Sequence, residues 1–185
     1  DYRPYQTPSI MASTLKTSEY GLRDNPTGIY VEQGEEVLVL VGDTHGQNVS
    51  MIVQDLVNGG YNGARTYALK EGENKVKVET GGLVYIQNLT QDYIPLELSE
   101  ADKEAAEAKT VTVHFPFGKV NGYYDVRNHT TQKEWEEILR NTRWQDIDVV
   151  GKYVVITWAV QDYMSYQTPI KEMVDLFDTV VEREW

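Results

Sequence analysis

The sequence predicts a mostly β protein, a jelly-roll-like β-sandwich with two or three appended helices, which makes the fold α+β overall. Three observations support this prediction. Short apolar or alternating segments recur along residues 28–129, and turn signals separate them. Helix-favouring sequence is found only around residue 100 and after residue 130. A chain of 185 residues is long enough to bury the core of one large domain or of two packed subdomains.

Three regions are expected along the chain. Residues 1–27 show no clear period and are expected to form an extended N-terminal arm. Residues 28–129 are expected to form the β-sandwich, and residues 130–185 a helix–strand–helix extension.

The sandwich begins with a turn at residues 25–28, where Pro fixes φ and Gly tolerates positive φ. Val37–Val41 is a continuous apolar run, as expected of a strand that is covered on both faces. A glycine-rich loop is expected at residues 58–63. The other segments with strand character are Asn48–Gln54, Lys75–Glu79, Leu83–Gln87 and Thr110–Phe115.

Three segments have helical character. Residues 99–109 favour a helix with Ser99 as N-cap, and the lack of an apolar stripe places this helix on the surface. Thr131 and Glu134 have the spacing of a capping box, and an apolar stripe with Trp135 follows them. After a strand-like segment at 148–160, Pro169 opens a last helix. Its stripe is Ile170, Met173, Val174, Phe177, Val180 and Val181.

The last helix has Glu182 and Glu184 in its final turn, where the helix dipole favours cations, and no glycine cap follows. We therefore expect the helix to continue beyond Trp185, and an exposed apolar patch around Phe177, Val181 and Trp185 where a following domain would dock.

The composition excludes several classes of function. A formal net charge of −12 argues against nucleic acid and anionic membranes as partners. The chain has no cysteine, which rules out disulfides and thiol chemistry. Its longest apolar runs have the length of strands, so no transmembrane segment is expected.

No catalytic or metal-binding residue can be named from motifs. His45, His114 and His129 are the only histidines, none is followed by Glu, and the HExxH zinc motif is absent. A nucleophile elbow and a phosphate-binding glycine loop are absent too. Each histidine is therefore expected to be a surface residue.

Aromatic side chains are the remaining candidates for binding. Tyr61 in the glycine-rich loop and the pair Tyr123 and Tyr124 could stack on the apolar face of a sugar ring. The alternative is that these tyrosines cover the edge of the core with their hydroxyls in water.

Three sequence blocks resemble the N-terminal β-sandwich portion of the enhancin-related (M60-like) zinc metallopeptidases, especially those of Bacteroides-type gut bacteria. Residues 25–43 (NPTGIYVEQGEEVLVLVGD) are similar to the opening of that family's peptidase domain. Residues 81–86 (GGLVYI) and 113–125 (VHFPFGKVNGYYD) resemble its later strands. Residues 94–108 look like an insertion.

The resemblance implies a secreted or surface-anchored hydrolase that cleaves mucins. It also implies that zinc belongs to a catalytic domain C-terminal to this chain. No zinc ligand of the family has a matching position here, so no cofactor is expected in this chain. Two functions remain open: a non-catalytic scaffold or substrate-positioning module for that catalytic domain, or an independent carbohydrate-binding module that recognises host glycans.

Overall fold

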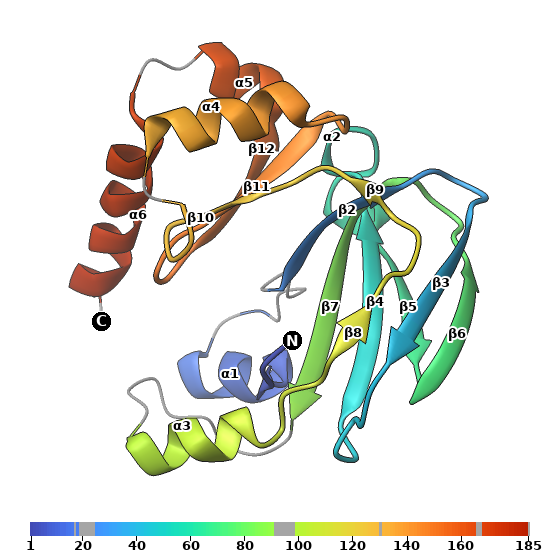
Figure 1. Ribbon diagram of the computed structural model, residues 1–185. Helices are drawn as coiled ribbons and strands as arrows, with labels where there is room; N and C mark the ends of the chain where they lie inside the picture. Colours follow the sequence, from blue (N-terminus) through green and yellow to red (C-terminus); the bar gives the residue numbers. More distant parts are fainter. Residues whose placement is uncertain (17, 19–24, 91–98, 130, 166–167, 185) are drawn as a thin grey trace.

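A computed structural model describes the chain except for residues 17, 19–24, 91–98, 130, 166–167 and 185. It consists of two β-sheets packed face to face, a third sheet beside them, and several helices (Figure 1). None of the helices in the described ranges is long and apolar enough to cross a membrane.

The larger sheet forms one layer of the sandwich. The order of its strands is β5 (Arg65–Leu69), β4 (Asn48–Gln54), β7 (Gly82–Thr90), β2 (Pro26–Val31) and β9 (Lys119–Val120), and β1 (Tyr5–Gln6) pairs with β7 in parallel. Strand β2 shifts register against β7 between Pro26 and Tyr30.

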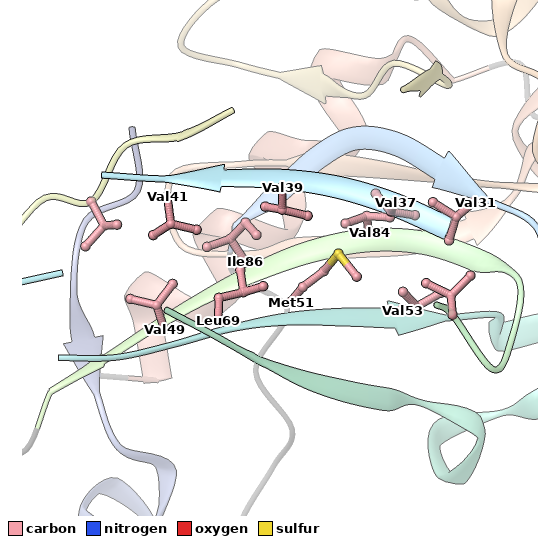
Figure 2. Packing of buried hydrophobic residues seen from close by; sticks show 12 residues of the cluster. Val31, Val37, Val39, Val41, Val49, Met51, Val53, Leu69, Val84 and Ile86 are labelled. Atoms are coloured by element: carbon pink, nitrogen blue, oxygen red, sulfur yellow. The ribbon is translucent and has the colours of Figure 1, made fainter. Parts of the chain in front are cut away.

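The smaller sheet forms the other layer, in the order β6 (Gly72–Lys77), β3 (Glu36–Val41) and β8 (Val113–His114). Side chains from the two layers meet in one core, where Val39 and Met51 are completely buried (Figure 2). The predicted sandwich with appended helices is therefore confirmed.

One strand differs from its prediction. Alternate residues of β3 point into the core, so Val37 and Val39 are buried while Leu40 on the other face is 37% exposed. The prediction that the run Val37–Val41 is covered on both faces was wrong, because only one layer packs on β3.

Residues 110–115 alternate from Val111 to Phe115 in the sequence, which predicts Val111, Val113 and Phe115 inside and Thr112 and His114 outside. The structure confirms this, with Val111 buried and Thr112 exposed.

The N-terminal segment differs as well. The expected extended arm at residues 1–27 contains a helix, α1 (Pro8–Leu15). Pro8 occupies the first helical turn, where a missing N–H costs nothing, and Lys16 ends the helix in the left-handed conformation. Ala12 is buried, so this helix packs on the protein rather than lying free.

Residues 58–63 were expected to be a loop, but they contain the end of α2 (Leu56–Gly59) and the single turn η1 (Tyr61–Gly63), with Gly60 between them. The predicted surface helix is confirmed as α3 (Glu100–Glu107), with a capping box between Ser99 and Asp102 and no buried residue. Residues 94–98 of the expected insertion lie outside the described part of the chain.

The C-terminal unit, defined as residues 124–184, has a three-stranded sheet and a core of its own. The order is β10 (Tyr124–Asp125), β11 (Asp146–Val150) and β12 (Val155–Ala159), and the helices are α4 (Gln132–Asn141), α5 (Val160–Ser165) and α6 (Ile170–Glu184).

The capping box that starts α4 is confirmed, because Thr131 Oγ1 accepts from the Glu134 N–H and the Glu134 carboxylate accepts from the Thr131 N–H. The predicted strand at 148–160 is instead a hairpin that turns after Gly151. Strand β10 precedes residue 130 yet pairs with β11. The sheet of the C-terminal unit thus begins inside the range expected for the sandwich.

Candidate functional site

The C-terminal unit lies beside the end of the sandwich formed by β9, β2 and α2 (Figure 1). Hydrogen bonds of polar side chains join the two parts there. Asn121 directly follows β9 and is 2% exposed. Its Nδ2 donates to the Asp146 carbonyl at 3.0 Å, and its Oδ1 accepts from the backbone N–H groups of Arg143 and Trp144 at 3.0 and 2.7 Å. One amide side chain therefore fixes the chain that enters β11.

A second contact joins the centres of the two sheets. Tyr85 on β7 donates its hydroxyl to Asp148 Oδ1 on β11 at 2.9 Å, and Thr157 on β12 donates to the same oxygen at 2.6 Å. Tyr85 is 1% exposed and Asp148 3%. Hydrogen bonds to a buried carboxylate are among the stronger ones in proteins, so this contact holds the C-terminal unit against the larger sheet.

Aromatic packing and acidic side chains complete this junction. The rings of Tyr30 on β2 and Trp144 lie 5.6 Å apart. Gln145 donates to Asp55 Oδ1 at 2.9 Å, and Asp55 is the N-cap of α2. Burial raises the pKa of Asp146, and the nearby Asp55 carboxylate raises it further. Burial at the junction thus disfavours the ionised form of Asp146.

Helix α6 is locked to the β11–β12 turn by one carboxylate. Asp178 accepts the backbone N–H groups of Lys152 and Tyr153, both at 2.8 Å. A Cβ at Gly151 would lie 2.7 Å from the Asp178 oxygens, so only glycine allows this close approach. The helix is therefore held at a defined angle to the sheet.

The outer side of α6 and the neighbouring strand β12 expose large apolar side chains. We define the α6–β12 face as Trp158, Leu176, Phe177 and Val180, which are 38%, 63%, 36% and 53% exposed. The rings of Trp158 and Phe177 meet edge to face at 6.2 Å. Met173 and Val174 of the same helix are buried in the core of the unit. Contiguous exposed apolar side chains on a rigid helix are typical of a protein docking surface.

The family model described as the N-terminal domain of M60-like peptidases matches residues 10–97. This part of the chain is therefore similar to the N-terminal domain of M60-like peptidases, as the sequence blocks indicated. None of the curated proteins matches the chain significantly.

Solved structures resemble this chain over nearly all of its length. A metallopeptidase in complex with Tn antigen has 28% identity and a TM-score of 0.80, over 98% of this chain and 33% of its own. A metallopeptidase from Bacteroides thetaiotaomicron has the same identity and TM-score, over 98% of this chain and 30% of its own. The chain therefore spans about a third of these relatives. The ZmpB metallopeptidase from Clostridium perfringens shares the fold at 14% identity and a TM-score of 0.72, over 96% of this chain and 38% of its own.

The three histidines lie in separate parts of the fold. His45 follows β3, with Nδ1 3.6 Å from an Asp43 oxygen, and His114 is exposed on β8. His129 follows β10 and accepts the backbone N–H of Asp125 at 3.3 Å. No group of three His, Cys, Asp or Glu residues in the described ranges could hold a metal ion.

The structure does not bring the three candidate tyrosines together. Tyr61 begins η1, and Tyr123 is half-buried with its ring against Gly28. Burial and the nearby Asp125 carboxylate raise the pKa of Tyr123. Tyr124 is completely buried, with its ring edge to face with Trp135 at 5.5 Å. Tyr124 therefore offers no exposed ring to a sugar, which corrects that part of the expectation, and binding by Tyr61 and Tyr123 stays a prediction.

The expected apolar patch is present but shifted around the helix. Phe177 belongs to it, Val181 is half-buried, and Trp185 lies outside the described residues. The sequence contained the missing signal, because Leu176 lies four residues before Val180 and broadens the apolar arc of α6 beyond the predicted stripe. The participation of Trp158 depends on tertiary packing and has no local signal.

Proposed function

We propose that this chain is the non-catalytic N-terminal portion of a secreted zinc metallopeptidase that acts on mucin-type glycoproteins. In this proposal the chain is a scaffold that holds the catalytic portion and positions its substrate. The α6–β12 face is the single observation that supports a scaffold most directly. It is fixed to the sandwich by the buried junction and exposes four large apolar side chains.

The comparisons support the class of the parent enzyme. The two relatives at 28% identity are metallopeptidases about three times as long as the matched region. The Clostridium perfringens ZmpC structure, an M60 catalytic domain in complex with sialyl T antigen, contains this fold in 38% of its chain at 13% identity and a TM-score of 0.68. The Tn antigen and sialyl T antigen complexes support mucin-type glycoproteins as substrates.

The part of the chain that the structure describes offers no group of residues that fits the zinc of such an enzyme. A catalytic zinc site needs three converging protein ligands, and the three histidines here lie on separate elements. The ion and its water-activating chemistry are therefore assigned to the portion that the α6–β12 face holds. The role of this chain is to position that portion relative to the substrate.

The proposal is tested in the parent polypeptide with the change Val180→Glu. A carboxylate at the centre of the face should prevent docking, because burying an unpaired charge is costly. Cleavage of a mucin-type glycopeptide should fall at least tenfold, which corresponds to about 1.4 kcal/mol.

The matched control is Val120→Glu, the same change at a position on β9 that is 73% exposed. It should leave cleavage and zinc content unchanged. A parent polypeptide without an HExxH segment, or equal activity of the two variants, would overturn the proposal.

A further inference from the structure

A cavity of about 240 Å³ opens where the two sheets of the sandwich part, beside the turn from β2 to β3. Ile29 of β2 and Val37 of β3 contribute apolar lining, and the segment from Phe117 to Lys119 forms one wall. These elements come from both sheets, so the position of the wall is set by the core of the sandwich.

Phe117 presents an aromatic ring at this cavity that no core residue covers. It is 79% exposed, the highest value among the large apolar side chains of the described residues. The next residue, Gly118, lies directly on the Ile29 side chain, because a Cβ there would be 3.2 Å from Ile29 Cδ1. The ring is thus attached to a segment that packs closely on the sandwich, and its face is available for stacking.

Fixed polar groups lie beside the ring. Lys119 Nζ is 3.1 Å from Glu35 Oε2 and 3.3 Å from Glu32 Oε1, and it lies 5.8 Å from the centre of the Tyr30 ring. Glu35 also accepts the backbone N–H of Glu32 at 2.9 Å. This N–H and the Lys119 ammonium lower the pKa of Glu35 although burial opposes them. A donor and two acceptors are therefore held in place with hydrogen-bonding capacity to spare.

The charge balance selects the class of ligand. Two carboxylates already neutralise the Lys119 ammonium, and the chain has a net charge of −12, so a phosphate or another anion has no uncompensated cation to bind. A neutral ligand with an apolar face and several hydroxyls matches both the ring and the donor–acceptor pair.

We infer that this cavity binds a neutral saccharide of one or two sugar units, stacked on Phe117 and hydrogen-bonded to Lys119 and Glu35. No residue of the α6–β12 face lines this cavity, and neither does Tyr123 or Tyr124. It does not depend on the proposed scaffold function, since the chain alone contains every group that it needs.

The test is a titration of the ¹⁵N-labelled chain, followed by amide chemical shifts. The probes are methyl galactoside, methyl N-acetylgalactosaminide and methyl glucoside, each at low and at high salt. At least one should shift amides around residues 29–38 and 117–119, with an affinity that salt leaves unchanged because the ligand is neutral. Phe117→Ala should weaken that affinity about tenfold or more, as expected for an aromatic anchor, whereas Phe117→Trp should retain it.

The control is Val120→Ala, a truncation at a neighbouring exposed position that does not line the cavity. Its affinity should equal that of the parent chain. The inference is overturned if none of the three glycosides shifts these amides, if Phe117→Ala binds as well as the parent chain, or if inorganic phosphate competes at low salt. It is also overturned if the metallopeptidase portion covers Phe117 in the parent polypeptide, because the cavity is then a protein docking site.

Discussion

The hydrogen bond from Tyr85 to Asp148 connects the sandwich to the C-terminal unit, and Tyr85→Phe removes only the donating hydroxyl. The donor and acceptor are 2.9 Å apart, and both side chains are buried. A hydrogen bond to a charged group contributes about 1.5–3 kcal/mol. The Phe ring keeps the packing of Tyr85 against Ile52 and Leu83, so the hydroxyl accounts for the whole expected loss.

We therefore expect Tyr85→Phe to lower the free energy of unfolding by about 1.5–3 kcal/mol. In a chain of this size, 1 kcal/mol shifts the melting temperature by about 2–4 °C, so the variant should melt about 3–12 °C lower. Urea unfolding followed by tryptophan fluorescence measures the loss, because Trp144 lies at the junction and Trp135 in the core of the C-terminal unit.

The control is Tyr30→Phe, which removes a hydroxyl from the same cluster of the junction. No hydrogen bond from the Tyr30 hydroxyl is seen among the described residues, so the control should change stability by no more than about 0.5 kcal/mol. The reasoning is refuted if Tyr85→Phe loses no more stability than Tyr30→Phe.

Three further predictions test the packing of the sandwich core, the close packing of Gly82 on Gln54, and the ion pair between Asp125 and Arg127. Met51→Ala empties a completely buried position, so urea unfolding should show a loss of about 2–5 kcal/mol; a loss below about 1 kcal/mol would contradict the packing. Gly82→Ala places a Cβ against the Gln54 carbonyl group, closer than van der Waals contact allows, so the melting temperature should fall sharply. An unchanged melting temperature would refute this close packing of Gly82 on Gln54. Burial raises the pKa of Asp125, but hydrogen bonds and charge from Arg127 outweigh this and lower it overall. The ionised form thus stabilises the fold above the unfolded pKa of about 3.9, and this stability is lost as the pH falls through the folded pKa. Arg127→Met should cost more stability at neutral than at acid pH, and equal losses at both would be evidence against this pair.

The features that the sequence predicted best are local ones. The capping box of Thr131 and Glu134 and the N-cap at Ser99 depend on residues three apart, and both were found as expected. The strand β4 was predicted with its observed bounds because its apolar residues alternate. Its neighbour β5 was not predicted, since four of its five residues are not buried and leave no apolar pattern.

Features that depend on distant residues could not be predicted. Tyr85 and Asp148 are 63 positions apart and meet only after two sheets have packed. The cavity beside Phe117 is formed by β2, β3 and the segment that enters β9, and Phe117 itself belongs to no apolar pattern. For Tyr124 the sequence left open whether the ring is available to a sugar or covers the edge of the core. The structure places the ring in the core beside Trp135, a contact that only the tertiary fold creates.

The central claim is that the α6–β12 face holds the metallopeptidase portion, and direct association tests it. The chain and the separately expressed metallopeptidase portion of its parent polypeptide are mixed, and binding is measured by calorimetry. We expect a complex that Val180→Glu weakens about tenfold or more and that Val120→Glu leaves intact. Absence of a complex, or equal affinities of the two variants, would contradict the account.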